Sequence, residues 1–212
     1  KMLHALSDRV KETGADIGLA FDGDGDRCGV VDNTGEEIFA DKVGLMLARD
    51  LSERHKGAKF VVDVKSTGLF AIDPVLKANG CETEYWKTGH SYIKRRANEL
   101  GALAGFEKSG HFFLQPPVGR GYDDGIVAAR CILEMLDRNP GKSVADLKAD
   151  FRAAMGREGD EPNPDFSQIP ESMMGYLGQA GRPYVDLAPL LVMTQQSLDA
   201  LARAATSSQI DV

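Results

Sequence analysis

The feature that most constrains this chain is a loop with an aspartate at every second position, Asp22-Gly23-Asp24-Gly25-Asp26-Arg27. Apolar runs at 17–21 and 28–31 flank it, so we expect a buried strand to lead into it and another to follow. Neighbouring carboxylates repel one another by about 1 kcal/mol per pair even in water, so they need a cation or protons. Carboxylate oxygens suit Mg²⁺, Mn²⁺ or Ca²⁺, and glycines allow the positive φ values that turn side chains towards one point. The loop therefore predicts a divalent metal site with Asp22, Asp24 and Asp26 as ligands.

Three other interpretations of this loop stay open. An EF-hand loop counted from Asp22 would need Gly and Glu where the chain has Arg27 and Asn33. A solvated acidic turn is possible, but turns seldom place carboxylates at period two directly behind an apolar strand. The strand followed by Asp-x-Asp is also similar to the haloacid-dehalogenase phosphotransferases, whose motif continues with Thr or Val where this chain has Asp26. Metal binding is the interpretation that the residues favour.

Composition excludes several classes of function. With 212 residues the chain can form one large domain or two small ones. A net charge of −7 without a basic stripe argues against nucleic-acid binding, and we interpret 94–96 as a solvated helix face. No apolar run approaches the roughly 20 residues that span a bilayer. Three cysteines without Cys-x-x-Cys spacing, Cys28, Cys81 and Cys131, indicate a reduced, cytoplasmic protein without structural disulfides or zinc. Because the chain begins at Lys1 rather than Met, we expect a piece of a longer protein.

Strand and helix patterns alternate along the chain. Helical spacing or caps predict helices at about 2–13, 41–55, 68–78, 91–100 and from 125 onwards, and apolar β-formers predict strands at 17–21, 59–64, 83–86, 102–106 and 111–114. This recurrence predicts an α/β fold of layered mixed sheets with flanking helices and functional loops at the carboxyl ends of strands. In the helix from 125, two acids stand at its positive end. We expect the buried face of that helix to carry Ile126, Ala129, Leu133 and Leu136.

Three further turns carry polar groups that could act together. Lys65 follows the apolar strand and is either a phosphate-binding cation or a solvated cap. His90, in Thr-Gly-His at the start of a helix, could bind an anion or transfer a proton. Glu107, Ser109 and His111 occupy a turn between two apolar strands and offer donors and acceptors that suit sugar hydroxyls. A polar hairpin tip is the structural alternative for that turn.

The acidic hexapeptide between two such strands resembles the metal-binding loop of the α-D-phosphohexomutase family, which includes the phosphomannomutase/phosphoglucomutases and the phosphoglucosamine mutases. The stretch Phe106-Glu107-Lys108-Ser109-Gly110-His111 is similar to the sugar-binding loop Gly-Glu-Met-Ser-Gly-His of the first branch, from which it departs at Phe106 and Lys108. Phosphoglucosamine mutases typically carry Gln where Lys108 stands, which argues against that branch. The stretch 121–125, Gly-Tyr-Asp-Asp-Gly, resembles the family's Gly-Phe-Asp-Asp-Gly before a helix.

This resemblance covers about residues 3–155 and implies a division of the chain. Residues 1–36 correspond to the C-terminal part of the second family domain with its metal loop, and 37–155 to the third domain with its sugar-binding loop. We interpret 156–212 as a linker and an unassigned tail. The Ser-His-Asn-Pro motif of the phosphoserine domain and the Arg-x-Ser-x-Thr/Asn-x-Pro loop of the C-terminal phosphate-binding domain do not occur in the sequence. The expected partners are therefore a hexose phosphate and the missing domains of the same polypeptide.

The resemblance implies an Mg²⁺-dependent isomerase of carbohydrate metabolism that exchanges phosphate between O1 and O6 of a hexose. The exchange would run through a phosphoserine and a bisphosphorylated sugar, with a glucose 1,6-bisphosphate-type activator. Roles carried over to matching positions are metal binding for Asp22, Asp24 and Asp26, phosphoryl contact for Arg27, proton transfer or charge stabilisation for Lys65 and His90, and sugar contact for Glu107, Ser109 and His111. The alternatives are a non-catalytic metal- and sugar-phosphate-binding fragment and the phosphoglucosamine mutase branch. We expect the chain alone to be inactive.

Overall fold

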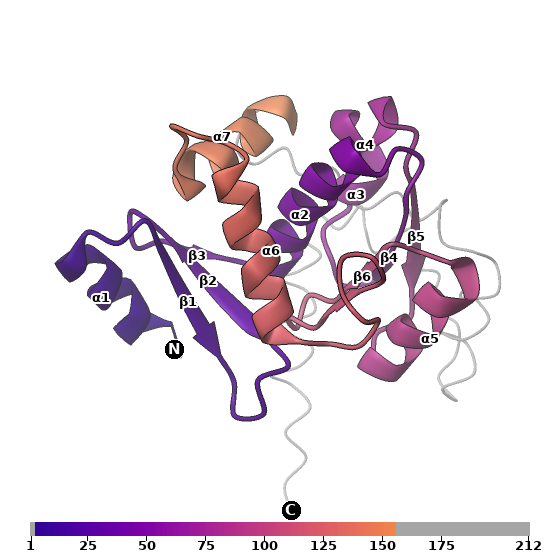
Figure 1. The fold of residues 1–212 in the computed structure, drawn as a ribbon, viewed down its shortest axis with the longest axis horizontal. Coiled ribbons are helices and arrows are strands. Elements are labelled where there is room, and N and C mark those ends of the chain that lie inside the picture. Colours follow the sequence, from indigo (N-terminus) through magenta and orange to yellow (C-terminus); the bar gives the residue numbers. More distant parts are fainter. Residues whose placement is uncertain (1–2, 156–212) are drawn as a thin grey trace, which may run out of the picture. The chain divides into compact units, whose positions relative to one another are not determined.

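The computed structural model describes residues 3–155, and the unassigned tail predicted at 156–212 lies outside the described residues. The elements are α1 (His4–Thr13), β1 (Ile17–Phe21), β2 (Cys28–Asp32), β3 (Glu37–Ile38), α2 (Ala40–Arg54), β4 (Lys59–Asp63), α3 (Leu69–Ile72), α4 (Pro74–Ala78), β5 (Glu82–Trp86), α5 (His90–Leu100), β6 (Ala104–Phe106), β7 (Phe112–Leu114), α6 (Gly125–Asp137) and α7 (Val144–Met155). They form two sheets with helices packed against them (Figure 1).

The first sheet is antiparallel, in the order β1-β2-β3. Phe21 pairs with Cys28, so the acidic loop joins two directly adjacent strand ends and projects from the sheet (Figure 1). The expectation of a buried strand at 17–21 is only partly correct, because Gly18 alone is buried and Phe21 is 45% exposed. The reason is topological: β1 is an edge strand.

The second sheet is mixed, in the order β5-β4-β6-β7, with β4 parallel to both of its neighbours and β7 antiparallel to β6. Its central strand β4 is buried from Phe60 to Asp63, as its nearly continuous apolar run predicts for a strand covered on both faces. Since β4, β5 and β6 are parallel, the loops that follow them meet at one edge of the sheet. Lys65 and Glu107 lie in two of those loops, and His90 begins the helix that follows the third. The expected α/β fold with mixed sheets is confirmed.

Helix α6 contacts both β2 and α2, and Figure 1 shows it passing between the first sheet and the other helices. The predicted buried face is half wrong: Ile126 is 69% exposed and Leu133 is 46% exposed, whereas Ala129 is buried and Leu136 packs against the core. The buried residues of this helix are Gly125, Ala128, Ala129, Cys131, Ile132 and Met135. Apolar residues occur on both faces of the helix, and the packing against β2, β7 and α2 decides which face is buried.

The helix predicted at 68–78 is interrupted and forms α3 and α4. Pro74 lacks a backbone N–H and cannot continue a helix that enters from α3. The Asp73 carboxylate instead accepts hydrogen bonds from the backbone N–H groups of Val75 and Leu76, at 2.9 and 3.0 Å. Asp73 is therefore the N-cap of α4, and the chain changes direction there.

An ion pair joins α7 to the first sheet. The Lys148 ammonium lies 2.5 Å from the Asp32 carboxylate and 2.6 Å from that of Glu36. Asp32 is fully buried at the end of β2, and it also accepts from the backbone N–H groups of Thr34 and Glu36. This contact anchors the β2–β3 turn, and with it the sheet that carries the acidic loop, to the helical layer.

Candidate functional site

The three aspartates of the acidic loop converge, as the sequence predicts. One carboxylate oxygen from each of Asp22, Asp24 and Asp26 lies within 4.8 Å of the others. Of the two loop glycines, Gly25 has a positive φ, +78°, whereas Gly23 does not. Within residues 3–155, Asp26 Oδ1 is buried and has no hydrogen-bond partner. An all-oxygen donor set with an unsatisfied buried oxygen fits a hard divalent cation.

Arg27 controls the charge of this loop. Its guanidinium Nε donates to Asp22 Oδ2, and its backbone N–H donates to Asp22 Oδ1 at 3.2 Å. The hydrogen bond from the guanidinium is the main reason why the pKa of Asp22 falls from 3.8 to about 2. Burial raises the pKa of Asp26, and the neighbouring carboxylates of Asp24 and Asp22 add to the rise. Asp26 is therefore the member of the set that needs a cation most.

The backbone of the acidic loop is joined to two distant segments. Arg27 and His111 form an isolated β-bridge, which links the loop to the turn before β7. The Gly125 N–H, in the first turn of α6, donates to the Gly25 carbonyl at 2.9 Å. A Cβ atom at position 125 would lie 2.7 Å from the Arg27 carbonyl oxygen and 2.8 Å from that of Gly25, so only glycine fits there.

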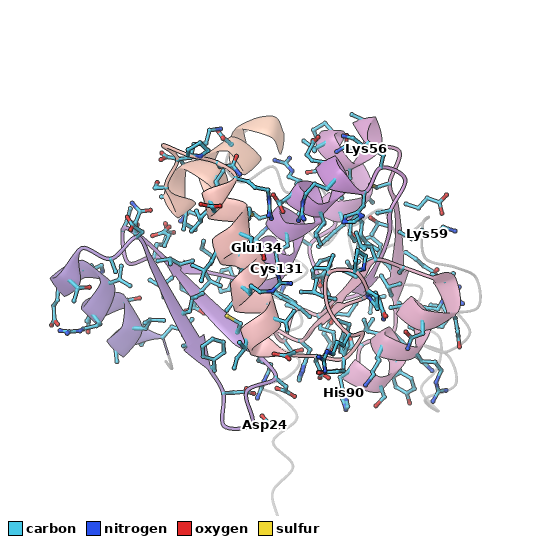
Figure 2. The ribbon with its side chains drawn as sticks, viewed as in Figure 1. Asp24, Lys56, Lys59, His90, Cys131 and Glu134 are labelled. Carbon is cyan, nitrogen blue, oxygen red and sulfur yellow. The ribbon has the colours of Figure 1, made fainter. Side chains whose placement is uncertain are left out.

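Two histidines and a further aspartate lie against the acidic loop. His111 Nδ1 lies 3.0 Å from Asp123 Oδ2 and 3.5 Å from Asp26 Oδ2. The rings of His90 and His111 stack with centroids 5.9 Å apart, and His90 Nδ1 lies 4.0 Å from Asp123 Oδ2. His90 is largely exposed, and His111 is mostly buried. Figure 2 shows Asp24 on its loop and His90 at the start of α5, both at the lower edge of the view.

Asp123 is a site residue that sequence reasoning missed. The pair Asp123 and Asp124 was interpreted as favourable charge at the positive end of a helix, and only Asp124 has that role. Asp124 Oδ1 accepts from the backbone N–H groups of Ile126 and Val127 at 3.0 Å, as an N-cap does. A helix needs one N-cap, so the second adjacent acid was the available signal that another partner existed.

Glu107 is the most deeply buried acid of the predicted site, with 1% of its surface exposed. Its Oε1 accepts a 2.7 Å hydrogen bond from the Gly89 N–H, which ties the 107–111 turn to the start of α5. Burial raises the pKa of Glu107, the Gly89 hydrogen bond opposes that rise, and the charge of nearby Asp63 adds to it. Ser109 in the same turn is exposed.

Lys65 lies in a loop that is fixed by hydrogen bonds of the neighbouring Thr67. The Lys65 side chain itself is exposed. Thr67 receives one bond from Tyr85 Oη to its carbonyl, at 2.7 Å, and its N–H donates to Asp41 Oδ2 at 3.0 Å. Within the described part of the chain, no hydrogen bond or ion pair joins the Lys65 ammonium to the other predicted site residues.

A cavity of about 620 Å³ lies between the acidic loop and the 107–111 turn. Its polar walls come from Asp22 and Arg27 on one side and from Lys108 and Ser109 on the other. Its apolar walls are Leu3, Ala20, Phe21, Ile38, Phe39 and Ala40, with Cys28, Gly29, Glu37 and Gly110 completing the lining. The structure therefore places the predicted phosphoryl contact, Arg27, and one predicted sugar contact, Ser109, on the same cavity.

Comparison with known proteins identifies the class to which this fold and site belong. The family profile "Phosphoglucomutase/phosphomannomutase, alpha/beta/alpha domain III" matches residues 39–154, and the profile for domain II of the same family matches residues 1–35. The chain belongs to the phosphoglucomutase/phosphomannomutase family, of which it contains the end of domain II followed by domain III. This confirms the family resemblance carried by the acidic loop.

Relatives of this chain include a phosphomannomutase/phosphoglucomutase of Pseudomonas putida, 44% identical over 149 residues, which cover 70% of this chain and 31% of that protein. A phosphoglucomutase of Neisseria meningitidis is 43% identical over 149 residues, 69% of this chain and 32% of that protein. The crystal structure of a phosphoglucomutase/phosphomannomutase family protein from Burkholderia thailandensis superposes with a TM-score of 0.62 at 36% identity, over 76% of this chain and 32% of that one. The chain thus spans about a third of the length of these relatives.

No helix among the described residues is both long enough and apolar enough to cross a bilayer. The thiols of Cys28, Cys81 and Cys131 are all free.

Proposed function

We propose that this chain is part of an Mg²⁺-dependent phosphohexomutase, of the phosphomannomutase/phosphoglucomutase type, that interconverts hexose 1-phosphate and hexose 6-phosphate. The observation that carries the proposal is the convergence of Asp22, Asp24 and Asp26 beside a cavity whose opposite wall is the 107–111 turn. The names of the relatives support the same activity. The whole reaction would use a phosphoserine and a bisphosphorylated sugar, for which the rest of a longer polypeptide is needed.

Mg²⁺ held by the three aspartates would neutralise negative charge that develops on the transferring phosphoryl group. Arg27 would contact the same group, since its half-exposed guanidinium stands on the cavity wall beside the carboxylates. His90 would stabilise charge or carry a proton from its exposed position at the start of α5. For Lys65, at the carboxyl edge of the same sheet, we propose phosphate contact through its flexible stem.

The 107–111 turn would hold the sugar hydroxyls. Ser109 is exposed on the cavity and can donate or accept. One oxygen of Glu107 is engaged by Gly89, so Glu107 would accept a sugar hydroxyl through Oε2. His111 would present Nε2, because its Nδ1 faces carboxylates.

We further propose the domain division inferred from the resemblance, with the end of domain II at 1–36, domain III at 37–155 and a linker and tail at 156–212. The three free thiols favour a reducing, cytoplasmic setting. Because the chain spans only 31% of its Pseudomonas relative, a non-catalytic role of these residues in binding metal and sugar phosphate is the second candidate. Turnover of glucose 1-phosphate by these 212 residues, with Mg²⁺ and a trace of the 1,6-bisphosphate, would exclude that second candidate.

Calorimetry tests the two halves of the site separately. We expect the chain to bind Mg²⁺ weakly and Asp24→Asn to abolish that binding, whereas Asp16→Asn, an exposed acid outside the loop, serves as the control. Unchanged Mg²⁺ binding in Asp24→Asn would contradict the metal site. For glucose 1-phosphate, we expect Glu107→Ala and Ser109→Ala to abolish binding. If both variants bind like the wild type, the assignment of the sugar contacts is wrong.

A further inference from the structure

Asp26 belongs to two groups of potential ligand atoms. One is the acidic loop set with Asp22 and Asp24, and the other is formed with His111 and Asp123. Its Oδ2 lies 3.5 Å from His111 Nδ1, while its Oδ1 is buried and has no hydrogen-bond partner among the described residues. Arg27 Nε lies 3.7 Å from Oδ1. An imidazole that donates to Oδ2 engages that oxygen and restricts the orientation of the carboxylate, so only Oδ1 remains for a cation. Whether Asp26 can offer both oxygens to a cation therefore depends on what His111 does.

Asp123 is the competitor for the same nitrogen. Asp123 Oδ2 lies 3.0 Å from His111 Nδ1, which is an ordinary hydrogen-bond length, whereas the 3.5 Å to Asp26 is at the limit. His111 and Asp123 are both mostly buried, so water competes little for this bond. His90 stacks on the imidazole, but its own Nδ1 is 4.0 Å from Asp123 and makes no hydrogen bond to it.

Main-chain contacts fix the relative positions of the segments that carry Asp26, His111 and Asp123. An isolated β-bridge pairs Phe113 with Asp123, and a second one pairs Arg27 with His111. The hydrogen bond from Gly125 to Gly25 joins the segment that carries Asp123 to the acidic loop itself. The three side chains therefore come from three segments that are connected by main-chain pairing rather than by loose side-chain contact.

We propose that Asp123 is a positioning residue of the metal site: by accepting the Nδ1–H of His111, it keeps the imidazole off Asp26 and leaves Asp26 for the cation. The proposal rests on the metal site of the proposed function. It assigns Asp123 an effect on cation affinity although Asp123 is not among the three loop ligands. It also assigns the donor role in the bond to Asp123 to Nδ1 of His111.

Three variants separate positioning from simple loss of charge. In Asp123→Ala, His111 turns to Asp26, and we expect Mg²⁺ affinity to fall about 10-fold, as is typical when a residue that orients a metal ligand is removed. In Asp123→Asn, the side-chain oxygen still accepts from Nδ1, so most of the affinity remains although the charge is gone. In the double variant Asp123→Ala, His111→Ala, no imidazole is left to capture Asp26, and the affinity recovers.

The test is Mg²⁺ calorimetry on the 212-residue chain, together with ¹⁵N NMR of the neutral His111 ring. The proposal is overturned if Asp123→Ala binds Mg²⁺ like the wild type. It is also overturned if Asp123→Asn binds Mg²⁺ as weakly as Asp123→Ala, or if the double variant still binds weakly. Either of these two results would show that only the negative charge of Asp123 affects Mg²⁺ affinity. A wild-type chain that binds no Mg²⁺ refutes the metal site of the proposed function instead. In that case the NMR spectra still decide about Asp123: a proton on Nδ1 that moves to Nε2 in Asp123→Ala supports the proposal, and a ring unaffected by the substitution overturns it.

Discussion

The two sheets each support one half of the candidate site, and they differ at the strand ends that carry it. Both contribute to one apolar core, in which Cys28, Val30 and Ile38 of the first sheet lie with Phe60 and Phe106 of the second. The second sheet is buried by apolar packing, in which Phe60 and Phe106 are fully inaccessible. The first has an edge strand that ends in the half-exposed Phe21, and a buried ion pair between Lys148 and Asp32 anchors it. The 107–111 turn therefore follows a fully buried strand, whereas the acidic loop follows an exposed strand end and is also held by specific polar contacts.

Asp22 on the acidic loop and Glu107 on the second sheet also differ in the direction of their pKa shifts. The guanidinium of Arg27 lowers the pKa of Asp22 to about 2, so this carboxylate stays charged on its loop. Burial raises the pKa of Glu107, whose environment favours the neutral form. Metal binding needs permanent charge, and a hydrogen bond to a sugar hydroxyl does not. The contrast holds for Asp22 and not for the whole metal set, because burial also raises the pKa of Asp26.

The largest effect that would test this comparison is the loss of Phe106. Its ring lies 5.4 to 6.1 Å from those of Phe60, Phe70 and Phe112, centroid to centroid, in the core of the second sheet. We expect Phe106→Ala to lower the free energy of unfolding by about 4 kcal/mol, measured by urea denaturation. Phe21→Ala on the first sheet should cost less than about 1 kcal/mol. Equal losses in the two variants would show that the buried strand of the second sheet contributes no more to stability than the exposed end of β1.

The ion pair is the corresponding test for the first sheet. Lys148→Ala leaves the Asp32 carboxylate buried without its cation, and we expect a loss of about 3 kcal/mol in unfolding free energy. Lys142→Ala, which removes an exposed pair with Asp150, should cost less than about 1 kcal/mol. Adding Asp32→Asn to Lys148→Ala should recover part of the stability. If Lys148→Ala has no larger effect than Lys142→Ala, the ion pair does not anchor the sheet.

A smaller effect is expected at Glu107. Glu107→Ala leaves the Gly89 N–H without its acceptor and should cost about 2 kcal/mol, while Glu107→Gln keeps an acceptor oxygen and costs less. Because the pKa of Glu107 is raised in the folded protein, its charged form opposes folding, and stability should increase as pH falls through that raised pKa. Glu107→Gln should remove this increase in thermal unfolding measured against pH. A wild-type profile of the opposite sign would contradict the burial of this charge.

The smallest effect is expected at Asp22, and its sign is opposite to that of Glu107. The folded pKa of Asp22 is about 2 and its ordinary value is 3.8, so its contribution to stability is fully present above about pH 4 and is lost as pH falls through about 2. Asp22→Asn should flatten the stability profile between those limits when no divalent cation is added. A variant that is as acid-sensitive as the wild type would show that Arg27 does not hold this carboxylate.

Local patterns predicted much of the fold and of the metal loop. Alternation of aspartate and glycine predicts convergent carboxylates because the loop is short and both of its ends are strand ends. The apolar run at 59–64 predicts a buried central strand for a similar reason: the packing environment is repeated at every residue. Pro74 is also a local signal for the interruption between α3 and α4, although we expected one continuous helix there. In each case the residues that determine the local structure are only a few positions apart in the sequence.

Patterns failed where partners come from distant segments. The inward face of α6 depends on the approach of β2 and α2, so Leu133 is exposed although its spacing is that of a core residue. The role of Asp123 depends on β-bridges that bring His111 and the acidic loop to it. Neither contact leaves a periodic signal in the chain.

By itself, the sequence determined that three carboxylates converge in the acidic loop and the order in which the strands and helices follow, because those properties are local. Only the tertiary structure decided which of these groups share a partner. It places Asp26 between a predicted cation site and His111, with Asp123 on the other side of the imidazole. Hydrogen bonds form over about 3 Å, and only folding brings residues 12 or 85 positions apart to 3.0 or 3.5 Å, as with His111 and Asp123 or Asp26 and His111.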